Sequence, residues 1–131
     1  SCVIDKVNIE KKNDVKGKTE IRNHLELTNI ESLNLKNQID QNPLKISFAY
    51  SLEYKENIAS ILFQGHILYL DEDKKLKEML AEWTKKKKVD PEIGVKLLNF
   101  IATKCHIKAL AAADELNLPP HIPIPRVKPK N

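Results

Sequence analysis

The chain has 131 residues, of which 41% are hydrophobic and 31% charged, and its formal net charge is +4. This composition is typical of a folding chain rather than a disordered one, and the length fits one domain over residues 1–131. No apolar run approaches the roughly 20 residues that cross a bilayer, and charge lies where the apolar part of a signal peptide would have to be. We therefore expect a cytoplasmic protein with no membrane partner.

Residues 1–70 have the apolar pattern of an antiparallel sheet. Every even position of 44–54 is apolar and every odd one is small or polar, which predicts a half-buried strand. Residues 58–70 are apolar on both sides, as is typical of a central strand or of one that offers a face to a partner. The short link between these runs predicts a hairpin. Alternation at Val3, Val7 and Ile9 and again over 19–27 predicts two further strands, so we expect four.

From residue 71 the spacing of apolar residues changes from two to three or four. Leu76, Met79, Leu80 and Trp83 predict a helix over about 71–87, with acidic residues at its start and lysines at its end. A second, long helix is expected over 91–117, opened by Asp90 as a side-chain cap and by the proline that follows. Its expected buried face comprises Ile93, Leu97, Ile101, Cys105, Ala109, Ala112 and Leu116. Residues 118–131 form a proline-rich basic tail that should run extended.

The expected fold class is therefore α+β, with a four-stranded antiparallel sheet over 1–70, two helices over 71–117 and the extended tail. The long helix carries more apolar surface than one narrow stripe, because Leu98, Phe100, Ile107 and Leu110 lie outside its buried face. We expect some of this surplus to meet another subunit or another protein.

The sequence contains no pattern that predicts a catalytic or metal site. The four histidines (His24, His66, His106 and His121) lack ligand spacing with one another. Cys105 falls on the buried face of the long helix, while we expect His106 on its surface. The three glycines are isolated, which excludes a phosphate loop, and the acidic run 71–73 lacks the glycine and distal glutamate of a calcium loop. We expect no enzyme activity, no metal and no cofactor.

Layout and local sequence together resemble the SecB export chaperone family. The resemblance lies in ISFAYSLEY (46–54) and ILFQGHIL (61–68), in the cysteine-containing LLNFIATKCHIKAL (97–110) and in NLPP (117–120). The charged helix over 71–87 and the basic net charge differ from the bacterial chaperone, and an archaeal-type SecB-like protein accommodates both. The resemblance implies a helix-covered sheet with apolar grooves that hold extended or non-native polypeptide, usually in a homo-oligomer.

Two sets of candidate binding residues follow. For a chaperone that captures polypeptide without ATP, the groove-lining candidates are Phe63, Tyr69, Trp83 and Phe100, since aromatic side chains suit sequence-tolerant recognition; the alternative for each is ordinary core. For a ribosome- or RNA-associated structural protein, the phosphate-contact candidates are Lys85, Lys86, Lys87, Lys88, Arg126, Lys128 and Lys130. The alternative for the lysine run is a solvated helix end.

Overall fold

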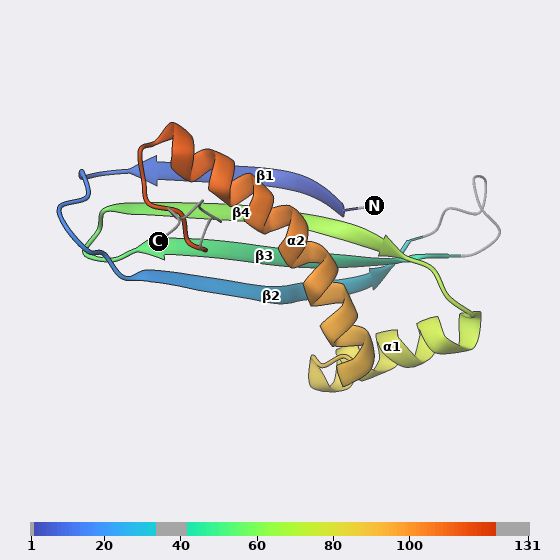
Figure 1. Cartoon of the computed structure of the whole chain (residues 1–131). Coiled ribbons are helices and arrows are strands. Elements are labelled where there is room, and N and C mark those ends of the chain that lie inside the picture. The colour runs from blue at the N-terminus through green and yellow to red at the C-terminus, as the bar shows by residue number, and fades with distance from the viewer. Residues whose placement is uncertain (1, 34–41, 123–131) are drawn as a thin grey trace, which may run out of the picture.

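A computed structural model of the chain describes residues 2–33 and 42–122 (Figure 1). The elements are β1 (Cys2–Lys11), β2 (Ile21–Ser32), β3 (Leu44–Tyr54), β4 (Ala59–Tyr69), α1 (Asp73–Lys86) and α2 (Pro91–Glu115). The predicted α+β class is confirmed: one antiparallel sheet of four strands precedes two helices, the last of them long. Neither described helix is long and apolar enough to cross a membrane.

The two strands of the predicted hairpin form the centre of the sheet. The strand order is β1-β4-β3-β2, and β3 pairs with β4 from Leu44 opposite Tyr69 to Tyr54 opposite Ala59. The turn between them places Glu56 and Asn57 at φ angles of 62° and 57°. The two strands that come first in the chain therefore lie at opposite edges of the sheet.

The sheet has one apolar face, covered by α2, and one open face of mainly polar and small residues. All the even-numbered residues of β3 are buried, and their cross-strand partners point to the same side. The odd-numbered residues of β3 lie on the open face, where Ser47, Ala49 and Ser51 are half-buried and Glu53 is exposed. Alternation over 44–54 is thus realised as the predicted half-buried strand.

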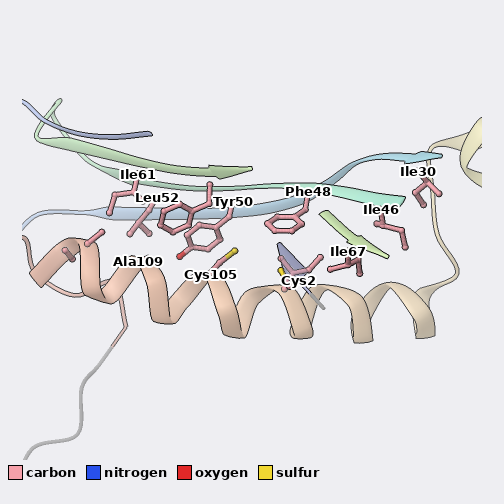
Figure 2. Packing of buried hydrophobic residues seen from close by; sticks show 14 of the residues in the cluster. Cys2, Ile30, Ile46, Phe48, Tyr50, Leu52, Ile61, Ile67, Cys105 and Ala109 are labelled. Atoms are coloured by element: carbon pink, nitrogen blue, oxygen red, sulfur yellow. The ribbon is translucent and has the colours of Figure 1, made fainter. Parts of the chain in front are cut away.

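The core lies between the apolar face of the sheet and α2, which crosses the strands diagonally (Figures 1 and 2). Ile101, Cys105 and Ala109 of α2 are fully buried against strand residues that include Phe48 and Tyr50. The predicted buried face is confirmed over the middle of α2, whereas Ile93, Leu97 and Leu116 are only partly buried. Burial of each large apolar side chain contributes about 1.5–3 kcal/mol to folding.

The capping of α2 at its N-terminus differs from the expectation. Asp90 precedes α2 as expected, but its side chain accepts no capping hydrogen bond. Its backbone carbonyl instead accepts the N–H of Gly94 at 2.8 Å, and Pro91 occupies the first turn. α1 buries Leu76, Met79 and Trp83 of its predicted apolar stripe, while Leu80 is only partly buried, and its C-cap, Lys87, has a left-handed φ of 54°.

After α2 the chain turns back onto the sheet. Asn117 has a φ of 56°, Leu118 is buried, and the Tyr54 hydroxyl donates to the Pro119 carbonyl at 2.5 Å. Lys11 Nζ donates to the Leu116 carbonyl at 2.7 Å. Residues 118–122 are non-helical, as predicted; the rest of the expected extended tail lies outside the described residues.

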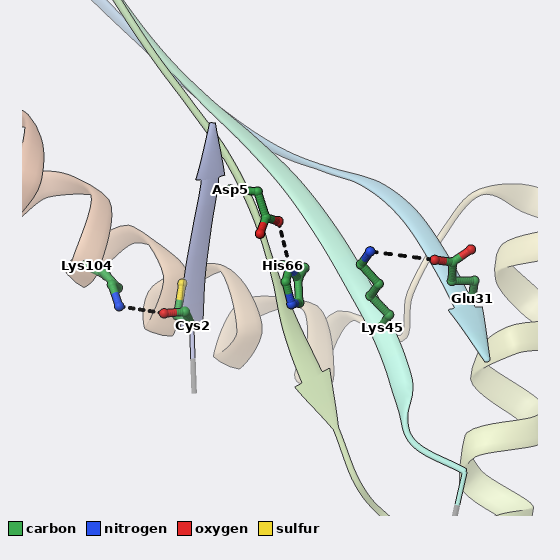
Figure 3. A network of polar contacts seen from close by, with 6 residues as sticks. All are labelled: Cys2, Asp5, Glu31, Lys45, His66 and Lys104. Atoms are coloured by element: carbon green, nitrogen blue, oxygen red, sulfur yellow. Dashed lines mark hydrogen bonds and ion pairs between the residues drawn. The ribbon is translucent and has the colours of Figure 1, made fainter. Parts of the chain in front are cut away.

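Polar contacts hold β1 against its neighbours (Figure 3). Lys104 Nζ of α2 donates to the Cys2 carbonyl at 2.5 Å. On the open face His66 Nδ1 of β4 lies 2.6 Å from Asp5 Oδ2, at the place where β1 bulges between Ile4 and Lys6. These contacts secure the N-terminal half of an edge strand.

Candidate functional site

Of the four aromatic candidates, Phe63 lies deepest in the protein. It is fully buried on the apolar face of β4, and its ring stacks on Tyr50 with 5.9 Å between the ring centroids and 11° between the planes. Lys108 Nζ lies 5.9 Å from the Phe63 centroid. This residue is packed as core and presents no surface to a ligand.

Trp83 is also packed against the core, on the inner side of α1. It is 7% exposed, and within the described part of the chain its indole Nε1 has no hydrogen-bond partner. Lys87 Nζ lies 5.6 Å from the ring centroid, in cation–π range. The two deepest aromatic candidates therefore act in packing.

Tyr69 lines a groove of about 570 Å³ between α1 and the first turns of α2. Met79, Ile93 and Leu97 complete its apolar lining. The Tyr69 hydroxyl donates to Asp71 Oδ2 at 3.0 Å. Burial, followed by this hydrogen bond, raises the pKa of Tyr69, so the phenol stays protonated near neutral pH.

Charged side chains surround this groove. Its acidic residues are Asp71, Glu78, Glu82, Asp90 and Glu92, and its basic residues are Lys75 and Lys96. Five carboxylates and two ammonium groups give a local charge of −3 in a chain of +4 overall. None of the five carboxylates forms an ion pair with another described residue.

Phe100 lies on the outer side of α2. Residues seven apart share one side of a helix, so Ile93, Phe100 and Ile107 form one row, to which exposed Ala111 adds a fourth member. Phe100 is 55% exposed and Ile107 is 66% exposed. We call Ile93, Phe100, Ile107 and Ala111 the α2 stripe. Because Ile93 also lines the groove, the groove and the stripe form one continuous surface.

The lysine run forms a separate surface at the end of α1. All four side chains of Lys85–Lys88 are exposed. The other three phosphate-contact candidates, Arg126, Lys128 and Lys130, lie outside the described residues. Only the helix-end part of the expected basic surface is therefore described.

The structure assembles a cluster that the sequence spacing did not reveal. His106 Nδ1 lies 2.8 Å from His121 Nε2 and 3.2 Å from the Tyr50 hydroxyl. The expectation that His106 is a surface residue is wrong, because the chain reversal after α2 lays His121 over it and leaves it half-buried. Asn117, which adopts a left-handed φ of 56° just after α2, and the following Pro119 and Pro120 were the sequence signals of this reversal.

Burial shifts the pKa of one member of this cluster, His121, and of the neighbouring thiol of Cys105. Burial, followed by nearby His106, lowers the pKa of His121, and burial, with Cys2 close by, raises the pKa of Cys105 to about 11. Cys105 is thus a protonated, fully buried thiol, and it forms no disulfide. Across residues 2–33 and 42–122 no three histidine, cysteine or acidic side chains are grouped to hold a metal.

Comparison of the chain with protein-family models, curated proteins and solved structures finds no match.

Proposed function

We propose that the chain is a non-enzymatic, SecB-like binding protein that captures extended or non-native polypeptide on apolar side chains, with the α2 stripe as its contact surface. One observation carries the proposal. Two large apolar residues, Phe100 and Ile107, are more than half exposed on the same side of the longest helix. Exposed apolar surface of this kind marks sites of protein interaction.

The surroundings of the stripe support the same function. The helix lies on a four-stranded antiparallel sheet, the layout on which the resemblance rests. Tyr69 lines the groove that continues the stripe, so two of the four aromatic candidates border one surface. Apolar contacts along a row suit recognition that depends on few specific hydrogen bonds.

Substitution of Phe100 by serine tests the proposal. Removal of a central apolar anchor weakens binding by more than about 1 kcal/mol, or roughly fivefold or more in Kd. We expect this loss for a labelled, permanently unfolded client measured by fluorescence anisotropy. Stability should change by less than about 0.5 kcal/mol, because the side chain is exposed.

Val95→Ser is the matched control. Val95 is 58% exposed on the same helix, but it lies about 140° around the axis from Phe100. Client binding should remain near the wild-type level in this variant. Equal binding by wild type and Phe100→Ser would remove the α2 stripe as the contact surface.

An RNA- or ribosome-associated role is the second candidate, and the observation that favours it is the exposed run Lys85–Lys88. Phosphate contacts lose affinity steeply as salt rises, whereas apolar capture changes little. Replacement of the four lysines by glutamine should leave client binding unchanged. A labelled RNA whose binding falls with salt, and is lost in the lysine variant, would favour the second candidate.

A further inference from the structure

We propose that the groove between α1 and α2 is a docking site for a lysine- or arginine-bearing segment of the bound polypeptide. The inference rests on the proposed function, since it names the chemistry of the polypeptide that the α2 stripe would hold. Its basis is the combination, in one groove, of an apolar lining and a surplus of carboxylates.

The volume and lining of the groove suit a peptide side chain. About 570 Å³ lies within the range of roughly 300–1,000 Å³ for binding clefts. Met79 comes from α1, and Ile93 and Leu97 come from α2, so the apolar contacts belong to both walls. An aliphatic stem, such as that of lysine or arginine, can pack on these walls while its charge stays at the rim.

The charge of the rim selects a cationic occupant. Glu78 and Glu82 stand one turn apart on α1, and Asp90 and Glu92 lie at the start of α2. Two like charges one turn apart repel each other, which an incoming cation relieves. These carboxylates have no ion-pair partner among the described residues, so they remain available to a ligand.

Continuity with the α2 stripe indicates a chain rather than an isolated small cation. Ile93 belongs to the lining of the groove and to the stripe, and from Ile93 to Ala111 the helix rises about 27 Å. An extended segment of about eight residues covers this length. A basic residue at one end of such a segment reaches the groove while apolar residues follow the stripe.

The test compares two short synthetic peptides on the full chain. One alternates lysine with leucine and valine around a proline, and the other has glutamine in place of each lysine. The double variant Glu78→Gln/Glu82→Gln removes two exposed charges without loss of volume. We expect its affinity for the lysine peptide to fall about three- to tenfold at low salt and its affinity for the glutamine peptide to stay unchanged.

Glu10→Gln/Glu53→Gln is the matched control, since it makes the same change in net charge on the open face of the sheet. An equal loss of affinity in this control would overturn the groove, because the effect would then follow net charge alone. Peptide binding that is weakened by Phe100→Ser but not by Glu78→Gln/Glu82→Gln would refute the groove as a docking site and retain the α2 stripe as the contact surface. Peptide binding that is weakened by Glu78→Gln/Glu82→Gln but not by Phe100→Ser would retain the groove as a docking site and refute the α2 stripe as the contact surface.

Two further readouts separate the occupants. Spermine carries charge without apolar side chains, and displacement of the lysine peptide at equal concentration would reduce the groove to a simple cation site. Sedimentation velocity tests whether a second copy of this chain occupies the groove. A wild-type oligomer that dissociates in Glu78→Gln/Glu82→Gln would make a neighbouring chain the occupant and overturn the peptide proposal.

Discussion

Gly65 is the position in the sheet with the least room for a side chain. A Cβ atom placed there would lie 2.1 Å from the Val3 carbonyl oxygen and 2.8 Å from Phe48 Cζ. The residue faces Ile4, beside the bulge of β1. Glycine thus allows the backbone of the edge strand to approach β4 closely, over the ring of Phe48.

Substitution of Gly65 by alanine should therefore destabilise the protein by about 3 kcal/mol, at the upper end of the range for overpacking. The contact on one side is backbone, which cannot rotate away as a side chain can. Urea unfolding followed by circular dichroism measures the change.

Gly94→Ala is expected to have the opposite effect on the stability of the protein. Apart from the two chain neighbours and the helix's own backbone, no atom lies within 4 Å of a Cβ atom at this position, and alanine favours helix by about 0.5–1 kcal/mol over glycine. This variant should be slightly more stable than wild type. A Gly65→Ala protein as stable as Gly94→Ala would contradict the close approach of β1.

At the scale of elements, the segment that follows α2 is held by polar contacts from two strands. Lys11 of β1 and Tyr54 of β3 donate to the carbonyls of Leu116 and Pro119. The ring of His121 then packs against His106, with 4.9 Å between their centroids. His121 Nδ1 has no hydrogen-bond partner within the described residues, so protonation would place an unpaired N–H in a buried position.

This contact makes stability depend on pH. Burial, followed by His106, lowers the pKa of His121 below its ordinary 6.5, so below that pH the unfolded chain binds more protons than the folded one. Stability should fall as the pH drops from about 6.5 through the lowered pKa and then level off with respect to this group. Urea unfolding at a series of pH values follows the loss.

His121→Gln should flatten this part of the pH profile. Tyr50→Phe, which removes the neighbouring hydroxyl but keeps both imidazoles, should retain it. The titratable groups that contact the His121 ring are His106 and Tyr50. An unchanged slope in His121→Gln would assign the pH dependence to another group.

At the scale of the whole molecule, apolar surface remains exposed on the sheet as well as on α2. Val3 is 42%, Val7 47% and Ile9 38% exposed, all on the edge strand β1. On the open face Leu68 of β4 is 44% exposed. Edge strands with exposed apolar residues tend to pair with a further strand.

We therefore expect a dimer or tetramer that forms through β1 and leaves the α2 stripe free. Sedimentation velocity should show this state in wild type and in Phe100→Ser, and a shift to monomer in Val7→Lys. The lysine places a charge on the paired edge, as natural edge strands do to prevent association. A wild-type monomer over a wide range of concentration would refute self-association.

The sequence predicted those parts of the fold that depend on local patterns. Alternation over 44–54 identified the central strand, and the short link after it identified the hairpin, because both depend on neighbouring residues. Apolar spacing also identified both helices, although α2 ends at Glu115 rather than at residue 117. The predicted side-chain cap at Asp90 is wrong: the backbone of Asp90 has the extended φ of −48° and ψ of 131° of a residue that precedes a helix, but its carboxylate accepts no capping hydrogen bond.

For the candidate site the sequence supplied the residue types and the apolar spacing that puts Phe100 and Ile107 outside the buried face of α2, but not which of the four aromatic candidates are exposed. Phe63, Trp83 and Phe100 were all aromatic candidates in the sequence, yet the first two are buried and the third is 55% exposed. Which side of a helix is left uncovered depends on how the helix crosses the sheet. The acidic groove was missed for the same reason, since its two walls are separate helices.

The sequence by itself determined the number, type and approximate bounds of the elements and the residues of the main core. The reason is that the spacing of apolar residues and the turn and proline residues that separate the elements act over only a few residues. Only the tertiary structure decided the strand order, the diagonal path of α2, the groove against α1 and the contact of His106 with His121. Each of these joins residues that lie far apart in the chain. Their geometry follows from the packing of whole faces, which no local pattern encodes.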